Sequence, residues 1–257
     1  MTDAAAVTDA AADAGRTPAP PAAGTLYCVP TPIAAGRTPQ SDLAPPVHAV
    51  LAGIDYVVAE NPKTARAFLK GVALARPIQA IEIATLDVNT RDDAIEPLLG
   101  PLRAGRDAAL VSEAGCPGVA DPGARLVLAA HRAGIPVMPM IGPSALLLAL
   151  MGSGLNGQYF GFVGYLPTDP EARRQRLREL EQRSRRDDET VLFIETPYRN
   201  QAMLDALLPT LQPSTWLCVA ADLTGERQRL RTERIAGWRA RPATLDKVPT
   251  VFLIRAG

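Results

Sequence analysis

Residues 107–123 read DAALVSEAGCPGVADPG, and they contain a strand, a tight loop and the start of a helix. The strand expected at 107–111 is short and wholly apolar after Asp107, as in a strand buried on both faces of a sheet. Three glycines and two prolines then predict a tight turn over residues 112–123, where the backbone can approach a ligand closely. A helix is expected from there to residue 133, where Gly134 ends it. This strand–loop–helix unit predicts an α/β fold.

The same alternation of strands and helices continues on both sides of this unit. In the first half of the chain we expect strands at 25–29, 55–59, 78–83, 107–111 and 135–140. Helices are expected between them at about 47–54, 62–72, 93–102 and 124–133, with a further helix opening at residues 142–143. Asn61 before Pro62 is a good helix start, and Thr90 with Asp93 is a plausible capping box. The alternation predicts a parallel sheet covered on both faces.

The second half of the chain has a different pattern. Strands are expected at 159–163, 191–195, 216–221 and 250–255, and helices at about 170–186 and 197–209. A glycine-rich polar stretch at 152–157 is a reasonable hinge between the halves. We therefore expect a disordered extension at 1–23, an N-terminal α/β domain with a parallel sheet at 24–151, and a C-terminal α/β domain with a mixed sheet at 152–257.

The composition excludes several classes of protein. The 257 residues include 27 basic and 27 acidic side chains, so the chain lacks the global positive charge of a nucleic-acid-coating protein. Its three cysteines form no C-x-x-C pair and its two histidines lack metal-ligand spacing, so we expect no metal site. No apolar run reaches the roughly 18 residues of a membrane span. The N-terminus has no secretory signal, and we expect a cytoplasmic protein with no membrane contact.

Loops at the carboxyl ends of the first-half strands are the expected ligand site, because open parallel sheets bind ligands at that edge. The segments concerned are 30–33, 60–63, 112–121 and 141–145. The loop at 112–121 has no lysine after its glycines and no G-x-G-x-x-G spacing, which excludes a P-loop and the dinucleotide fingerprint. A neutral loop rich in backbone contacts suits a ligand with amino-acid and nucleoside parts. A plain strand-to-helix turn is the alternative.

Eight short motifs along the chain carry a resemblance to a known family. They are LYCVPTPI at 26–33, VAE at 58–60, LVSEAG at 110–115, ADPG at 120–123, IGPSA at 141–145, SGL at 153–155, GYLP at 164–167 and ETPYR at 195–199. Together and in this order they resemble the ribosomal small-subunit methyltransferase I family of the tetrapyrrole methylase superfamily. The resemblance covers about residues 24–257. At 197–199 the chain has Pro-Tyr-Arg where the family usually has Pro-His-Arg.

This resemblance implies a fold and a chemistry. It implies two tetrapyrrole methylase-like α/β domains, S-adenosylmethionine as methyl donor in the cleft between them, and a homodimer. The family's activity is 2′-O-methylation of a cytidine in small-subunit rRNA, which implies RNA or the small ribosomal subunit as a partner. The implied donor contacts are Pro30, Thr31, Pro32, Ile33, Ser112, Glu113, Ala114, Gly115, Pro117, Val119, Asp121, Ser144, Ala145, Tyr165 and Leu166.

The expected reaction needs help at the acceptor. A ribose hydroxyl is a poor nucleophile, so a general base would assist the transfer. Glu60 and Glu195 follow predicted strands and are the candidates, and Arg199 at a helix start could bind a phosphate. The structural alternatives are a capping-region carboxylate for Glu60 and a salt bridge between Glu195 and Arg199.

RNA binding has one further candidate surface. The helix at 170–186 carries seven arginines against three glutamates, the arginines being Arg173, Arg174, Arg176, Arg178, Arg183, Arg185 and Arg186. A phosphate-binding face and a solvated helix face both fit this composition. Aromatic residues for base stacking are few, and those expected near the cleft also fit core positions; they are Tyr159, Phe160, Phe162, Tyr165 and Tyr198.

Three functions stay open on the sequence. The first is an S-adenosylmethionine-dependent methyltransferase that acts on RNA. The second is a methyltransferase of the same fold that acts on a small molecule such as a tetrapyrrole, although the glycine-rich acidic loop usual after the first strand of such enzymes is absent. The third is a catalytically inactive ribosome-binding paralogue. Donor binding separates the third from the others, and methyl incorporation into undermethylated small subunits separates the first from the second.

Overall fold

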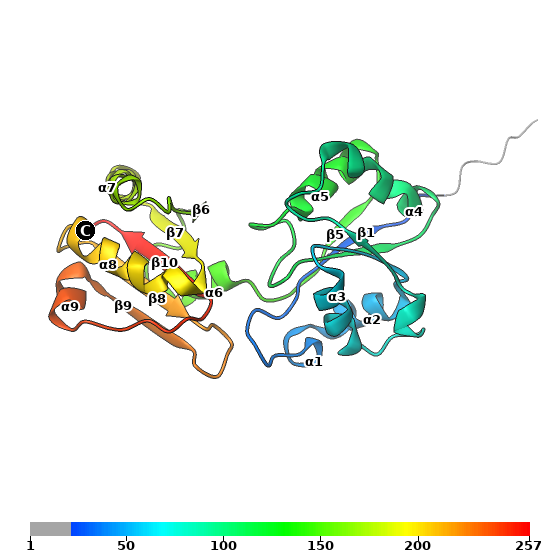
Figure 1. Ribbon diagram of the computed structural model, residues 1–257, viewed down its shortest axis with the longest axis horizontal. Helices are drawn as coiled ribbons and strands as arrows, with labels where there is room; N and C mark the ends of the chain where they lie inside the picture. The colour runs from blue at the N-terminus through cyan, green and yellow to red at the C-terminus, as the bar shows by residue number, and fades with distance from the viewer. Residues whose placement is uncertain (1–21) are drawn as a thin grey trace, which may run out of the picture.

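The computed structural model describes residues 22–257, which fold into two α/β lobes that lie side by side (Figure 1). Each lobe is built on one five-stranded sheet, and the chain crosses from the first lobe to the second through the segment that leads into α6. The α/β class is therefore confirmed. The extension expected at 1–23 lies outside the described residues except for its last two.

The first lobe contains a sheet in the order β3-β2-β4-β1-β5, and all of its strand pairs are parallel. Its strands are β1 (Leu26–Val29), β2 (Tyr56–Ala59), β3 (Glu82–Thr85), β4 (Ala108–Val111) and β5 (Val137–Pro139). Its helices are α1 (Pro39–Asp42), α2 (Pro45–Gly53), α3 (Pro62–Lys70), α4 (Gly100–Arg103) and α5 (Gly123–Arg132), with 3-10 turns η1 (Ile78–Ala80), η2 (Asp92–Ala94) and η3 (Glu96–Leu99).

Alternate residues of the central strands bury both faces of this sheet. Leu26, Val58 and Leu110 point to one face, where they pack with α5 and the turns before β4. Val57 and Val111 point to the other, where they pack with α2 and α3. Because the helices cover both faces, the open edge at the carboxyl ends of β1, β2 and β4 is the place left for a ligand.

Two elements of this lobe differ from the prediction. The strand expected at 78–83 is a 3-10 turn followed by β3, because the chain turns after Pro77, whose carbonyl accepts a hydrogen bond from Ala80. The helix expected at 93–102 is broken into η2, η3 and α4, because Pro97 and Pro101 each open a new short helix. The capping box predicted there is wrong, because the Thr90 hydroxyl bonds instead to Asp87.

The second lobe contains a sheet in the order β6-β7-β10-β8-β9, in which β6 and β7 are parallel and the other neighbours antiparallel. Its strands are β6 (Phe160–Tyr165), β7 (Thr190–Glu195), β8 (Trp216–Ala221), β9 (Arg229–Arg234) and β10 (Thr250–Arg255). The helices are α6 (Ala145–Ser153), α7 (Pro170–Asp187), α8 (Asn200–Thr210) and α9 (Ile235–Ala240), with the 3-10 turn η4 (Pro197–Arg199) before α8. The α7, α8 and α9 helices cover one face, and α6 covers the other.

The sequence did not reveal β9 and α9, and it placed the division of the chain too late for the packing of α6. The expected boundary at 151/152 falls within α6, whose Ala149 and Leu150 are buried against Cys218 and Leu253 of the second sheet. Ser144 is the N-cap of this helix, two residues after the start expected at 142. We propose that the chain divides just before α6.

Candidate functional site

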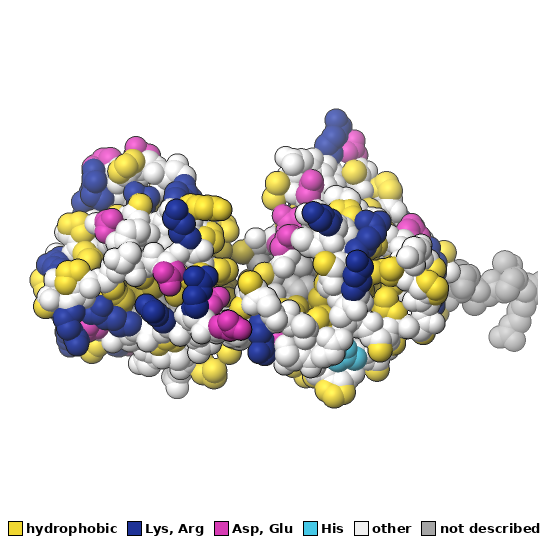
Figure 2. Space-filling model, turned by 60° about the horizontal axis from the view of Figure 1, so that its bottom comes forward, with side chains coloured by type: hydrophobic (Ala, Val, Ile, Leu, Met, Phe, Trp, Pro, Cys, Tyr) yellow, Lys and Arg dark blue, Asp and Glu magenta, His cyan; other side chains and the backbone are white. Residues whose placement is uncertain are grey.

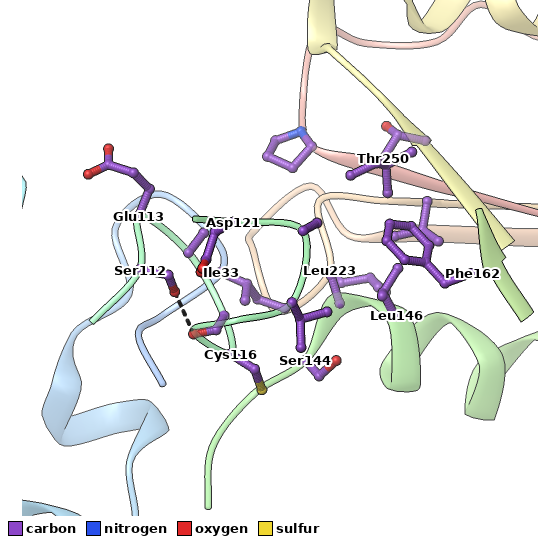
Figure 3. Close-up of a pocket in the computed structure, with 18 of the residues that line it drawn as sticks. Ile33, Ser112, Glu113, Cys116, Asp121, Ser144, Leu146, Phe162, Leu223 and Thr250 are labelled. Atoms are coloured by element: carbon purple, nitrogen blue, oxygen red, sulfur yellow. Dashed lines mark hydrogen bonds between the residues drawn. The ribbon is translucent and has the colours of Figure 1, made fainter. Parts of the chain in front are cut away.

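A cavity of about 460 Å³ lies between the two lobes (Figure 3). From the first lobe it is lined by the loops that follow β1, β2 and β4. From the second lobe it is lined by the start of α6, by residues of β6, by the ends of β7 and β8 and by the start of β10. Its volume falls in the range of roughly 300–1,000 Å³ that is usual for small-molecule sites. Figure 2 shows acidic side chains on the edge of the first lobe that faces the gap.

The loop after β4 forms the floor of the cavity and is held in one conformation. Thr31 and Gly115 exchange two backbone hydrogen bonds of 2.9 and 3.0 Å, and the Ser112 hydroxyl donates to the Gly115 carbonyl at 3.0 Å (Figure 3). Gly115 has φ of +76°, a conformation that side-chain-bearing residues rarely adopt. A Cβ there would lie 3.3 Å from Ile33 Cγ2, so glycine also provides the space. At Gly115 the loop thus presents bare backbone to the cavity, beside lining residues such as Ala114, Cys116 and Val119.

Asp121 fixes the far end of the same loop. Its Oδ1 accepts hydrogen bonds from the amides of Gly118 at 2.8 Å and Gly123 at 2.7 Å. Its Oδ2 is buried and has no hydrogen-bond partner among the described residues. Burial raises the pKa of this carboxyl, while the two amides act in the opposite direction. Asp121 is therefore mainly a loop anchor, with one oxygen paired to two amides and the other buried without a partner in residues 22–257.

Glu60 stands at the end of β2 and also lines the cavity. Burial raises its pKa, and the nearby negative charges of Glu113, Asp121 and Asp87 add to this effect. Glu113 points away from the cavity centre in Figure 3, and its carboxylate accepts a hydrogen bond from Thr64 of α3. A carboxylate with a raised pKa takes up a proton more readily than an ordinary one, which is what a general base requires.

Glu195, at the end of β7, forms the acidic part of the second wall. Its Oε1 accepts hydrogen bonds from Nε and Nη2 of Arg199 at 2.9 and 2.6 Å and from the Thr196 amide at 2.7 Å. The salt bridge considered from the sequence is therefore present. Oε2 is buried, and no described residue satisfies it. Arg199 itself does not line the cavity, because the ion pair turns its guanidinium toward Glu195.

Most of the predicted site residues meet at this cavity. The ones that line it are Glu60, Glu195, Ile33, Ser112, Glu113, Ala114, Gly115, Val119, Asp121, Ser144, Ala145 and Tyr165. Those predicted but not lining it are Pro30, Thr31, Pro32, Pro117, Leu166 and Arg199. Thr31 is buried under the loop that it hydrogen-bonds, and Leu166 belongs to the core beneath α7, so neither side chain is open to a ligand.

Sequence reasoning missed most of the apolar wall from the second lobe. Phe162 was expected near the cleft, but the other members of this wall were not; they are Leu146, Ile194, Leu223, Pro249 and Val251, with Thr250 beside them. Phe162, Leu146 and Leu223 lie together across the cavity from the loop after β4 (Figure 3). The sequence offered one clue to these residues, which is their position in the expected strands. Ile194 lies near the end of β7, and Pro249 directly precedes β10.

The arginine-rich helix α7 carries less free charge than its composition indicates. Arg174 and Arg178 pair with Glu171, Arg176 pairs with Glu179, Arg183 pairs with the buried Glu189, and Arg186 pairs with Asp187. Arg173 is only 7% exposed. Arg185 alone among these arginines is both exposed and without an ion pair to any residue in 22–257. The structure therefore favours a solvated, internally neutralised face for α7.

Within residues 22–257, no three His, Cys, Asp or Glu side chains are grouped so that they could hold a metal ion. Among the helices of the same residues, none is both long enough and apolar enough to span a bilayer.

Known proteins share both the sequence and the architecture. The family model for Tetrapyrrole (Corrin/Porphyrin) Methylases matches residues 25–237. The chain is 38% identical over 201 residues to the ribosomal RNA small subunit methyltransferase I of Xylella fastidiosa strain Temecula1, covering 78% of this chain and 69% of that protein. It is 37% identical over 201 residues to the protein of that name from Synechocystis, covering 78% of this chain and 67% of that protein.

Solved structures of lower sequence identity share the fold. The methyltransferase CobJ superposes with a TM-score of 0.58 at 23% identity, over 91% of this chain and 93% of that one. A uroporphyrin-III-C-methyltransferase from Thermus thermophilus superposes with a TM-score of 0.52 at 20% identity, over 90% and 94% of the two chains. With the family match over both lobes and relatives above 30% identity, the chain belongs to the tetrapyrrole methylase family, and within it to the ribosomal RNA small subunit methyltransferase I group of methyltransferases.

Proposed function

We propose that this protein transfers a methyl group from S-adenosylmethionine to a ribose 2′-hydroxyl of small-subunit rRNA. The relatives above 30% identity are named for action on that RNA, whereas the tetrapyrrole-type structures support only the fold. The observation that carries the proposal is the interlobe cavity, which combines a backbone-lined loop, an apolar wall and buried carboxylate oxygens without partners.

These features fit the methyl donor. Ile33, Phe162 and Leu223 provide apolar surface for an adenine ring and a thioether chain. Asp121 and Glu195 line the cavity, and their carboxylates suit donor groups such as the adenine amine or the ammonium. When bound, S-adenosylmethionine would supply a methyl group on a positively charged sulfur, and the negative charge of the cavity wall complements that charge.

The chain's own contribution is to position the acceptor and accept its proton. Glu60 would accept the proton that the ribose hydroxyl loses when its oxygen takes up the methyl group that the bound donor would supply. Residues of both lobes line the cavity and would hold the two reactants together, and such positioning supplies a large part of the rate enhancement in displacement reactions. Glu195 acts through its ion pair with Arg199, which fixes the end of β7 at the cavity wall.

The RNA backbone contacts the first lobe at α3 in this proposal. Lys63, Arg66 and Lys70 share its exposed side at helical spacing, and none of them forms an ion pair with another described residue. Two of the three lysines of the chain stand on this one helix. Because α3 begins two residues after Glu60, its first turn is next to the cavity. Unpaired cations beside the site attract phosphates more strongly than the paired arginines of α7.

A homodimer is the second part of the proposal. The sequence of α6 is ALLLALMGS, which is apolar on every side, and such a helix is normally buried all round. One side packs on the second sheet, but Leu147 and Met151 on the other side are exposed. Ile141, just before α6, and Met138, on the edge strand β5, are exposed as well. A second copy of the chain would cover this apolar patch, which we define as Met138, Ile141, Leu147 and Met151.

The experiment is methyl transfer in vitro. Purified protein, labelled S-adenosylmethionine and small ribosomal subunits from a strain lacking the gene should give label in the rRNA, at the ribose of one nucleotide. Subunits from the parent strain should take up little label, because the site is already methylated. Donor binding without transfer to RNA would favour a small-molecule acceptor, and the absence of donor binding would favour an inactive paralogue.

A further inference from the structure

Tyr198 is the most exposed of the large hydrophobic side chains among the described residues, at 81%. It belongs to η4, immediately after Thr196 and Pro197, which line the cavity. The Lys247 ammonium lies 5.6 Å from the centre of its ring, within the range of a cation–π contact. An exposed aromatic ring next to residues that line a cavity offers a flat apolar face on which a planar group can pack.

The surrounding hydrogen bonds hold η4 in place. Nε and Nη2 of Arg199 both donate to Oε1 of Glu195, which links the residues on either side of Tyr198. The Arg199 amide also donates to the Thr196 carbonyl at 2.9 Å. The ring is therefore presented by a fixed turn, which lowers the entropy lost when a ligand stacks on it.

Lys247 is held beside the ring by a separate set of bonds. The buried Asn200 follows η4, and its Nδ2 donates to the carbonyls of Asp246 at 3.1 Å and Val248 at 2.8 Å and to the Thr250 hydroxyl at 2.9 Å. These bonds tie the strand-entry segment that carries Lys247 to the start of α8. Pro249 and Thr250 of that segment line the cavity, as do Thr196 and Pro197, so Tyr198 and Lys247 each stand within two residues of a cavity-lining position.

We propose that Tyr198 and Lys247 form a stacking platform for the base of the acceptor nucleotide, with Tyr198 packing on the base and Lys247 facing an adjacent phosphate. This inference rests on the proposed RNA substrate. Aromatic faces bind single-stranded or extruded bases with little sequence preference, and a lysine supplies the charge that the neighbouring phosphate requires. The nucleotide would then be oriented with its ribose toward the cavity, where Glu60 lies.

The test compares single variants in binding to a short fluorescein-labelled single-stranded RNA and in methyl transfer to undermethylated small subunits. Tyr198→Ala should weaken RNA binding by roughly five- to 150-fold, the range expected for one lost base–aromatic stack, and should raise KM. Tyr198→Phe should bind like the wild type, since it keeps the ring. Lys247→Ala should lower the salt dependence of binding by roughly 0.7 of a unit in the log–log slope.

Matched controls come from the same lobe. Tyr159 is 53% exposed and directly precedes the first residue of β6, whereas Tyr165 at the other end of that strand lines the cavity. Tyr159→Ala therefore removes an exposed ring that does not line the cavity. Arg185→Ala removes one unpaired charge from α7. Neither should change RNA affinity, and all variants should bind S-adenosylhomocysteine by calorimetry as the wild type does.

Two failures can be told apart. A wild-type protein that binds S-adenosylhomocysteine but no RNA would overturn the proposed RNA substrate. A wild-type protein that binds RNA, with a Tyr198→Ala variant of equal affinity and KM, would overturn the stacking platform alone.

Discussion

The ionisation of Glu60 should couple the ligand affinity of the cavity to pH. Its raised pKa means that the free protein holds a proton there to higher pH than an ordinary glutamate does, and a bound cation reverses the effect. Binding of a cation therefore releases protons, and affinity rises with pH until Glu60 is fully ionised. S-adenosylmethionine carries a sulfonium charge that S-adenosylhomocysteine lacks. The affinity ratio of these two ligands should rise with pH through the range in which Glu60 of the free protein ionises, which lies above that of an ordinary glutamate, and should then level off.

Calorimetric titrations of both ligands across this pH range measure the ratio directly. In Glu60→Gln the rise should be smaller, because only the other carboxylates of the wall remain. Glu82→Gln is the control, since Glu82 is exposed at the opposite end of the same sheet. A ratio that is independent of pH in the wild type would show that Glu60 does not sense the sulfonium.

At Gly115, the effect of a substitution on ligand binding can be separated from its effect on stability. Gly115→Ala places a Cβ at positive φ, 3.3 Å from Ile33 Cγ2 and 3.6 Å from the Pro143 carbonyl, both beside the cavity. We expect S-adenosylhomocysteine binding to weaken at least about tenfold, along with a loss of roughly 1 kcal/mol of stability. Gly134→Ala has the same backbone strain at φ of +68° but meets no atom within 4 Å. It should lose similar stability and no affinity, and equal effects on affinity would contradict a steric role for Gly115.

For single residues, the sequence was most informative where a residue of a suitable chemical type stands at the end of a predicted strand or the start of a predicted helix. Asn61 accepts the hydrogen bond from the Lys63 amide that a helix start predicts, at 2.9 Å. Glu60 and Glu195 both reach the cavity as strand-end carboxylates. The salt bridge between Glu195 and Arg199 was one of the two expectations from the sequence. The burial of Thr31 could not be foreseen, because it depends on contacts with the loop after β4, which is distant in the chain.

Individual elements were predictable where apolar periodicity was strong. The strands β1, β2, β4, β7, β8 and β10 lie at or within one residue of their expected bounds. The missed strand β9 has the sequence RLRTER, in which charges dominate, because it is an edge strand paired only with β8. Two of its arginines cover tryptophan rings, Arg231 over Trp238 at 3.9 Å and Arg234 over Trp216 at 4.8 Å. Such a charged strand has no pattern that distinguishes it from a loop.

The helices α3 and α7 give opposite expectations for RNA. A variant with Lys63→Glu, Arg66→Glu and Lys70→Glu should bind RNA more weakly at low salt, with a slope of log affinity against log salt reduced by roughly 0.7 per lost phosphate contact. A variant with glutamate at Arg174, Arg176 and Arg178 should show a much smaller change, because these arginines already pair with carboxylates. Fluorescence anisotropy at several salt concentrations measures both slopes. The reverse order of effects would place the RNA on α7 instead.

For the whole molecule, the exposed side of α6 predicts self-association. Met151→Glu introduces a charge into the apolar patch, where it would be buried in a dimer, and light scattering should show the mass of the single 27.3 kDa chain. Val88→Glu is the control, since Val88 is 76% exposed, almost as much as Met151 at 77%, and lies outside the patch. The wild type and this control should have twice the chain mass at micromolar concentration. A wild type with the mass of one chain would contradict the proposed dimer.

The architecture of the cavity shows why half of the site was found from the sequence. The first-lobe wall is built from loops at one edge of a parallel sheet, and that edge follows from the strand pattern. The second-lobe wall uses residues such as Phe162, Leu223 and Val251, which are ordinary core residues by type. They face the cavity only because the two lobes meet there, and that arrangement has no local signal in the chain.

The central claim is that this protein methylates one ribose of small-subunit rRNA, and a methylation map of that RNA tests it most directly. The map should be recorded for the parent strain, a strain lacking the gene, and the same strain carrying the wild-type or the Glu60→Gln gene. We predict that one ribose 2′-O-methyl group disappears with the gene and returns with the wild-type copy, but returns to a much lower level with Glu60→Gln. Identical maps for the parent and deletion strains would contradict the account.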